Sequence, residues 1–308
     1  MRIAKQDKIK EMGCQMPINF FQLEEISKKI HLSLENAEKE LFHDIFLYLL
    51  FSKKLKKYTR YLAFKGGTCL YKCYGFPRFS EDLDFDILLG KLSKKNIDLL
   101  FNKHLTNMPR EIFGFANYFR IKENPTGFNV HTDIRDPAFS QTHKDCHIKF
   151  DLSSRKKLIQ DIKEIEYNAS LTLNYFNVER LFSLNTVDPK EIFAEKILAI
   201  LDKRFIFGQR DEARDLFDLY ILLLKGYGCK IEDVKEKLAD RKNVFTLENF
   251  YDSIYKTAKS REWDLMVNQL IIESKLKKLG LSIKDIGFEK ISKEVINKIN
   301  NLYFKKEI

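Results

Sequence analysis

The sequence predicts an α/β (α+β) fold, in which a mixed-sheet domain with N-terminal helices is followed by a C-terminal helical domain. Three observations predict it: apolar residues recur at helical spacing up to residue 57, short alternating segments recur between residues 60 and 180, and the pattern after Leu181 is almost wholly helical. The 308 residues with 44% hydrophobic content can bury a sizeable core. We expect two domains, residues 1–185 and 186–308, with a site in the cleft between them.

Residues 20–57 predict two helices, because Leu41, Ile45 and Leu49 form an apolar stripe at helical spacing. Residues 61–89 predict a strand, a Gly-Gly turn, a short helix, a second turn and another strand, since the period changes wherever glycine or proline interrupts it. Residues 92–106 again predict a helix. Four later segments rich in Phe, Val, Thr and Ile predict the remaining strands: residues 118–123, 127–134, 147–153 and 170–176.

The second domain is expected to begin with a capped helix. Asp188 is the expected N-cap, with Pro189 at the first helical position and Glu191 three residues after the cap. Further helices are expected around residues 210–225, 230–241, 246–259, 261–279 and 284–300, with Gly226, Gly228 and Gly280 as stops.

Charge and cysteine content narrow the class of protein. The 54 Lys+Arg against 44 Asp+Glu give a formal net charge of +10, which favours anionic partners such as nucleotides or RNA, although a Lys-rich bias of the host gives the same surplus. A polar N-terminus and the lack of an 18-residue apolar run predict a cytoplasmic protein without a membrane span. Five scattered cysteines indicate neither a disulfide framework nor a zinc site: Cys14, Cys69, Cys73, Cys146 and Cys229.

Alternating acidic and apolar residues follow Ser80. On a strand, Asp82 and Asp84 project from one face while Leu83 and Phe85 enter the core. Two like charges so placed repel each other unless a cation lies between them, and divalent metal ions serve this purpose in phosphoryl transfer. The alternative is a solvated strand edge.

The segment upstream favours the metal site. Gly66, Gly67 and Thr68 end a strand and begin a helix whose free N–H groups suit a phosphate, and 13 residues separate Thr68 from Asp82. A third carboxylate is then expected from a neighbouring strand. Asp151 is our choice, because it shares a face with Lys149 while Ile148 and Phe150 take the other face; Asp145 is the competing choice.

These residues resemble the DNA polymerase β-type minimal nucleotidyltransferase fold, whose signature is Gly-Gly or Gly-Ser, a gap of about this length, and Asp-x-Asp. More narrowly, five segments resemble the AbiEii/AbiGii toxin family of nucleotidyltransferases: GGTCL, RFSEDLDFD, KFD, AEKILAILDKR and ARDLFDLYIL. The resemblance covers roughly residues 60–225. It implies a toxin of a toxin–antitoxin or abortive-infection module, with a cognate antitoxin as partner.

The resemblance also implies roles for individual residues. Asp82, Asp84 and Asp151 would bind metal and act in catalysis together with Lys196 and Asp218. The nucleotide would be held by residues of both domains: Gly66, Gly67, Thr68, Arg78, Ser80, Lys149, Lys196, Arg214 and Asp215. Asp86 departs from the expected pair, and it either displaces a metal or sits in solvent.

The residue pattern of the second domain agrees with part of this assignment. Lys196 has apolar helical neighbours, so its buried charge needs an anionic partner, for which an NTP phosphate or Asp218 would serve. Asp211, Asp215 and Asp218 form an acidic stripe that is expected to meet Lys196, an arginine or a metal. A simple salt-bridged helix pair is the alternative.

We therefore expect an enzyme that moves a nucleoside monophosphate from an NTP to an acceptor, with two Mg²⁺ ions, or Mn²⁺ in their place, as cofactors. The resemblance favours the 3′ end of tRNA as the acceptor, and the basic surplus agrees with it. Asp151 is the candidate for assisting deprotonation of the acceptor hydroxyl. A hydroxyl of a protein Ser, Thr or Tyr is the chief variant. A non-catalytic module that senses NTP or binds a partner, and a metal-dependent phosphoesterase, are the rivals; the latter lacks histidines at ligand-like spacing.

Overall fold

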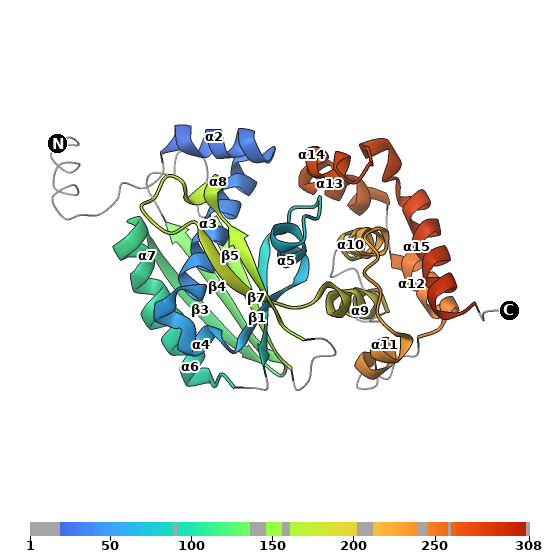
Figure 1. Cartoon of the computed structure of the whole chain (residues 1–308), viewed down its shortest axis with the longest axis horizontal. Coiled ribbons are helices and arrows are strands. Elements are labelled where there is room, and N and C mark those ends of the chain that lie inside the picture. The colour runs from blue at the N-terminus through green and yellow to red at the C-terminus, as the bar shows by residue number, and fades with distance from the viewer. Residues whose placement is uncertain are drawn as a thin grey trace. The chain divides into compact units, whose positions relative to one another are not determined.

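The structure, a computed structural model, describes residues 19–88, 91–135, 146–155, 161–201, 212–238, 245–257 and 260–305. The chain divides into two compact units, which Figure 1 shows and which we describe one at a time. Unit 1 comprises the described residues up to Cys73, from Ser80 to 155, and from Ile162 to Thr186. Unit 2 comprises Tyr74–Phe79 and the described residues from Val187 onwards.

Unit 1 is built on a seven-stranded sheet in the order β3-β4-β5-β2-β1-β7-β6. The pairs β2–β5 and β1–β7 are parallel, and the other described pairs are antiparallel, so the predicted mixed sheet is confirmed. The strands are β1 (Leu62–Lys65), β2 (Asp82–Leu88), β3 (Ala116–Asn124), β4 (Gly127–Arg135), β5 (Cys146–Arg155), β6 (Lys163–Asn168) and β7 (Leu181–Thr186).

Helices cover the apolar face of this sheet. Phe46 of α3 stacks edge-on against Phe150 of β5, with ring centroids 5.3 Å apart, and Phe101 packs on the same ring at 5.2 Å. The described helical elements of unit 1 are α2 (Phe20–Ile30), α3 (Leu34–Phe51), η1 (Lys53–Leu55), α4 (Lys56–Thr59), α5 (Gly66–Cys73), α6 (Lys94–Asp98), the π-helical η2 (Leu99–Leu105), α7 (Thr106–Phe113) and α8 (Ser170–Leu173). The two helices predicted before residue 57 correspond to α2 and α3.

A buried lysine fixes α5 to α3. The ammonium of Lys72 lies 2.6 Å from Asp44 Oδ1 and 2.7 Å from Glu40 Oε1, and its side chain is fully buried. Tyr167 donates to the same Asp44 oxygen at 2.7 Å, and Thr172 donates to the other. Burial lowers the pKa of Lys72, but the two carboxylates outweigh it and raise that pKa above its usual value, so the lysine stays charged.

Unit 2 is helical in its described part. It contains α9 (Pro189–Leu201), α10 (Glu212–Leu224), α11 (Ile231–Leu238), α12 (Leu247–Thr257), α13 (Ser260–Leu270), α14 (Glu273–Lys277), η5 (Ile283–Asp285) and α15 (Phe288–Tyr303). The predicted cap of the first helix is confirmed, because the Asp188 carboxylate accepts the Lys190 N–H at 2.8 Å.

The prediction of a strand over residues 170–176 was wrong. Residues 170–173 form α8 instead, because Asn168 Oδ1 accepts the Ser170 N–H at 2.9 Å and starts a turn, after which the Leu173 N–H bonds to the Ala169 carbonyl. Leu173 and Phe176 are both buried at helical spacing.

Two further predictions of helices were wrong: the helical pattern was predicted to begin directly after Leu181, and a single helix was predicted over residues 261–279. Residues 181–186 form strand β7, in which Leu184 and Thr186 are buried at alternate positions. The single helix expected over residues 261–279 is two helices, since Ile272 donates its N–H to the Pro77 carbonyl at 2.7 Å and thereby leaves the helical hydrogen-bond pattern. In the described part of the chain, no helix is long and apolar enough to cross a membrane.

The Lys72→Met variant is expected to unfold more easily by roughly 3–5 kcal/mol, because it leaves two buried carboxylates without their cation. Urea unfolding followed by circular dichroism measures this. Lys94→Met is the control, since Lys94 pairs with Glu123 while 71% of its side chain is exposed, and such a pair contributes roughly 0–1 kcal/mol. Equal unfolding midpoints for the two variants would show that the buried pair does not hold α5 in place.

Candidate functional site

The three predicted carboxylates lie on two neighbouring strands. β2 and β5 run parallel, with Asp84 opposite Asp151 and Asp82 opposite Lys149. The predicted alternation is confirmed, because the intervening residues of both strands are buried: Leu83, Phe85, Ile148 and Phe150. The sheet therefore places the three carboxylates and one lysine on a common face.

The charges of this group are not balanced. Lys149 Nζ lies 3.5 Å from Asp82 Oδ2 and 4.0 Å from Asp151 Oδ2, so one ammonium is shared between two carboxylates. Burial of Asp84, together with the charges of Asp82 and Asp151, raises the pKa of Asp84 to about 7. Lys65 and Lys149 act in the opposite direction but do not cancel this rise. Asp84 is therefore the carboxylate that a further cation would stabilise most.

The donor set fits a divalent cation in its chemistry. Carboxylate oxygens are the ligands that Mg²⁺ and Mn²⁺ prefer, and the raised pKa of Asp84 shows that the ionised group lacks compensating charge. Among the described residues, no group of three His, Cys, Asp or Glu side chains is arranged so that it could hold a metal ion. The ammonium of Lys149 occupies the space between two of the carboxylates instead.

The glycine turn touches this group directly. Gly66 has a φ of +74°, and a β-carbon added to it would lie 2.2 Å from Asp84 Oδ2. The position therefore requires glycine both for its backbone conformation and for the approach of the carboxylate. Gly67 and Thr68 are buried at the start of α5, and the Thr68 hydroxyl donates to the Asp82 backbone carbonyl. The hydroxyl thus ties the turn to β2, and the first N–H groups of the helix are those that suit a phosphate.

Asp86 does not sit in solvent, as one of the two expectations for it had proposed. It is fully buried, and Lys65 Nζ lies 2.6 Å from its Oδ1. Lys65 is also the register partner of Asp84. The lysine before the two glycines is therefore a site residue that the sequence analysis missed, although its position in Lys-Gly-Gly was a usable signal. Ser80, another predicted nucleotide contact, is buried just ahead of β2.

The remaining predicted residues form a separate group inside unit 2. Asp218 accepts two hydrogen bonds from Arg78, at 2.9 Å from Nε and 2.6 Å from Nη2. Lys196 Nζ lies 2.8 Å from Asp218 Oδ2 and 2.6 Å from Asp215 Oδ1. All four are buried. The expectation that the acidic stripe meets Lys196 and an arginine is thus confirmed for Asp215 and Asp218.

The contacts in the structure bear on the individual predictions for this group. Arg78 was predicted to hold the nucleotide, and in the structure its guanidinium makes a bidentate contact with Asp218. Arg214 lies half-buried on α10. Asp211 and the competing carboxylate Asp145 fall outside the described residues.

Burial alone raises the pKa of Asp218, but the charges of Arg78 and Lys196 outweigh it and hold that pKa below its usual range. Burial likewise lowers the pKa of Lys196, and Asp215 and Asp218 more than offset this, so its pKa is raised. The group is therefore two cations and two anions that keep one another charged.

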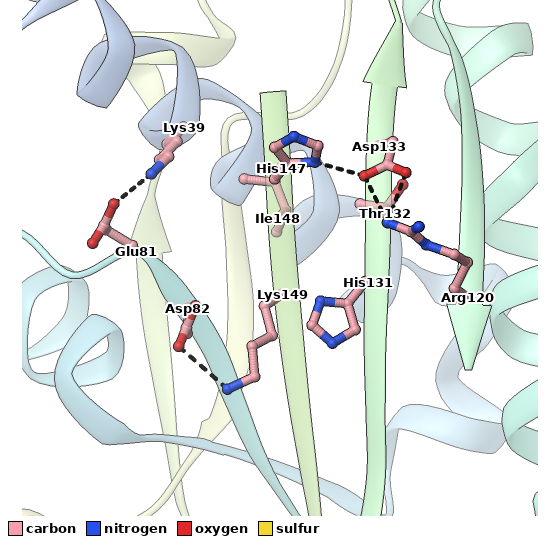
Figure 2. A pocket seen from close by; sticks show the side chains of 10 residues that line it. All are labelled: Lys39, Glu81, Asp82, Arg120, His131, Thr132, Asp133, His147, Ile148 and Lys149. Carbon is pink, nitrogen blue, oxygen red and sulfur yellow. Dashed lines mark hydrogen bonds and ion pairs between the residues drawn. The ribbon is translucent and has the colours of Figure 1, made fainter. Parts of the chain in front are cut away.

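A cavity of about 230 Å³ adjoins Asp82 in unit 1. Figure 2 shows its lining, which comes from β2, β3, β4, β5 and α3: Lys39, Glu81, Asp82, Arg120, His131, Thr132, Asp133, His147, Ile148 and Lys149. Apart from Asp82 and Lys149, these residues were not predicted as site residues, because cross-strand neighbours cannot be identified before the strand order is known.

Comparison with known proteins assigns the family. Residues 48–286 match the family model described as nucleotidyl transferase AbiEii toxin, type IV toxin–antitoxin system. The chain belongs to this family. The AbiEii chain is therefore a nucleotidyltransferase toxin of a type IV toxin–antitoxin system, for which the family implies an NTP substrate, a divalent metal ion and an antitoxin partner. No curated protein matches the sequence.

A solved structure supports the fold. The AbiEii chain is similar to MenT4, a nucleotidyltransferase toxin from Mycobacterium tuberculosis, with a TM-score of 0.52 and 19% identity over 88% of this chain and 94% of that one. The mixed sheet with many helices is thus the arrangement of a known nucleotidyltransferase toxin.

Gly66→Ala is expected to reduce nucleotidyl transfer by about 100-fold or more, because the added methyl group must displace the Asp84 carboxylate. The activity is measured as the label that passes from a labelled NTP to the macromolecules of a cell extract. Gly75→Ala is the matched control: Gly75 has a similar φ of +68° but nothing within 4 Å of the added carbon, so it carries only the backbone strain of about 1–2 kcal/mol. Equal activities of the two variants would contradict the proximity of Gly66 to the reacting groups.

Asp218→Asn is expected to destabilise the AbiEii chain by roughly 3–5 kcal/mol at neutral pH, because it leaves two buried cations short of one anion. Since the folded pKa of Asp218 is depressed, its stabilisation is full above the unfolded value of about 3.9 and is lost as pH falls through the folded value. The acid side of the stability profile should therefore be flatter in the variant. Urea midpoints at several pH values test this, with the exposed Asp264→Asn as control.

Proposed function

We propose that this chain transfers a nucleoside monophosphate from an NTP to the 3′ end of tRNA, with Mg²⁺ as the metal and with Asp82, Asp84 and Asp151 as the reactive carboxylates. The observation that carries the proposal is the register of β2 and β5, which sets Asp84 opposite Asp151 directly beside Gly66. Three acidic groups next to a helix that starts in a glycine turn form the arrangement that a metal-bound triphosphate requires.

The metal, as two Mg²⁺ ions or Mn²⁺ in their place, would neutralise phosphate oxygens and increase the acidity of the acceptor hydroxyl. The residues of the chain do the rest. The backbone of Gly66, Gly67 and Thr68 would hold the phosphates, and Asp82, Asp84 and Asp151 would hold the metal. Lys149 would then bind the nucleotide, because its contacts of 3.5 and 4.0 Å to Asp82 and Asp151 are weak enough to be exchanged.

The transfer step is a displacement in line. The acceptor hydroxyl loses its proton with the help of Asp151, its oxygen bonds to the α-phosphorus of the NTP, and the bond from that phosphorus to the departing pyrophosphate breaks. Asp151 is suited to this role because 37% of its side chain is exposed, so a substrate hydroxyl can reach it. The nucleotide that is used stays open.

The net charge of the chain supports tRNA as the acceptor. A net charge of +10 favours a polyanion over a peptide as the partner. Modification of a protein Ser, Thr or Tyr would show that the acceptor is a protein and not tRNA. Binding of NTP without turnover would show that the chain is a binding module and not an enzyme. A tRNA substrate also places the protein in the cytoplasm.

The roles of the unit 2 residues in binding the nucleotide or in catalysis remain predictions (Arg78, Lys196, Arg214, Asp215 and Asp218). The pairing of Arg78, Lys196, Asp215 and Asp218 with one another supports a role in holding the segment Tyr74–Phe79, which follows α5 in the chain and precedes β2. Loss of transfer in Asp218→Asn without loss of stability would instead support direct action.

The experiment is incubation of purified protein with Mg²⁺, each of four α-³²P-labelled NTPs and total tRNA. We expect label on tRNA with the wild type, a loss of at least about 1,000-fold in Asp82→Ala/Asp84→Ala because the metal ligands are gone, and no label after chelation of the metal. Asp151→Asn should bind NTP but turn over slowly. Asp264→Asn is the control for removing one exposed carboxylate.

Label on a protein in place of tRNA would replace the proposed acceptor. Wild-type turnover in Asp151→Asn would remove the role of Asp151 in deprotonation. Undiminished transfer in the double variant would contradict the site itself.

A further inference from the structure

A polar row crosses four strands of the sheet and ends at the carboxylates. Arg120 of β3 pairs in register with His131 of β4, His131 with Lys149 of β5, and Lys149 with Asp82 of β2. Side chains at register-paired positions point to the same face, so the four lie side by side. Figure 2 shows His131 and Lys149 next to each other on that face.

A second row runs beside the first. Tyr118, Asp133 and His147 are register partners on the same three outer strands, each two residues from its neighbour in the first row. Asp133 joins the two rows, because its carboxylate lies 2.9 Å from Arg120 Nη2 and 2.6 Å from His147 Nδ1. These contacts hold Arg120 and His147 over the sheet.

The two rows are open to solvent. Tyr118 is 65% exposed, the Arg120 side chain 72% and the His147 side chain 68%, whereas the residues between them on β3 and β5 face the core. Most of the Tyr118 side chain is therefore available to a partner. The cavity of about 230 Å³ lies over the same strands and reaches Asp82. An open polar surface thus leads directly to the reacting groups.

We propose that this face of β3, β4 and β5 is the acceptor surface, and that it binds the single-stranded end of an RNA. The inference rests on the proposed function and specifies the residues that hold its acceptor. Tyr118 stacks on a base, Arg120 binds a backbone phosphate, and the strand runs along the first row so that its terminal hydroxyl arrives at Asp82 and Asp151.

The dimensions and chemistry of the surface agree with such a strand. Three strand spacings separate β3 from β2, roughly 14 Å, which is the length of a few nucleotides. Exposed cations beside an aromatic ring are the combination by which proteins hold single-stranded nucleic acid, since every base offers a face for stacking and every linkage a charge. A peptide acceptor would need neither feature. Lys122, two residues beyond Arg120 on the same face of β3 and also exposed, adds a further cation.

Binding of a fluorescent RNA oligonucleotide with a free 3′-hydroxyl, followed by anisotropy in the absence of NTP, tests the surface. We expect Tyr118→Ala to weaken binding roughly 5- to 100-fold, and Tyr118→Phe to bind as the wild type does, because stacking does not use the hydroxyl. Arg120→Gln should reduce the slope of log K against log salt by about 0.7, the value for one phosphate contact on a single strand. Affinity for NTP should be unchanged in all three.

Lys94→Gln is the matched control, since Lys94 is a cation of unit 1 with 71% of its side chain exposed and pairs with Glu123, which belongs to neither row. Circular dichroism confirms that each variant is folded. If the wild type labels tRNA and both Tyr118→Ala and Arg120→Gln bind RNA normally, the acceptor surface is overturned and the proposed function stands. If the wild type labels a protein and no RNA, both are overturned.

Discussion

Repulsion among Asp82, Asp84 and Asp151 is the constraint that the rest of unit 1 accommodates. Two parallel strands in register bring the carboxylates together, and the apolar residues between them, buried under α3 and η2, prevent the strands from slipping to relieve the repulsion. Lys149 offsets part of the charge from one side. Burial of Asp84 and the charges of Asp82 and Asp151 raise the pKa of Asp84, and Lys65 and Lys149 do not cancel this rise. Stability is given up here for a site at which the proposed metal ion would supply the missing positive charge.

Charge is handled in the opposite way in unit 2. Arg78 and Lys196 face Asp215 and Asp218, and the four are buried together with their charges satisfied. Two ionic groups predicted for one purpose therefore differ in physical character. The first is partly open to solvent and short of positive charge, as the proposed metal site requires. The second is closed and neutral, as a structural connection is.

Local patterns predicted most of the fold. The Asp-x-Asp strand, the glycine turn and the capped helix at Asp188 were predicted because each depends on residues a few positions apart. The prediction of a strand over residues 170–176 was wrong, because β-prone residues such as Thr172 were given more weight than the turn that Asn168 starts. β6 was not predicted either, since charged residues obscure its alternation.

Local patterns proposed the carboxylates of the candidate site. Alternation placed Asp82 and Asp84 on one face of a strand, the glycine segment upstream favoured a metal site there, and Asp151 needed the expectation of a neighbouring strand. Arg120, His131 and Asp133 were missed because they approach Asp82 through the order β3-β4-β5-β2, which no local pattern specifies. Lys65 was missed for another reason: its ion pair with Asp86 depends on both side chains being buried, and the sequence placed neither of them in the core.

The segment Tyr74–Phe79 connects the glycine helix to the carboxylate strand, yet it belongs to unit 2. The Phe79 N–H bonds to the Leu270 carbonyl, and the Pro77 carbonyl accepts the Ile272 N–H. A ribosome makes residues 270–272 long after residue 79, because synthesis runs from the N-terminus. The link between the glycine helix and the carboxylate strand therefore acquires these hydrogen bonds only after residue 272 has been made. Until then, a segment that lacks its final backbone partners joins the two elements of the candidate site.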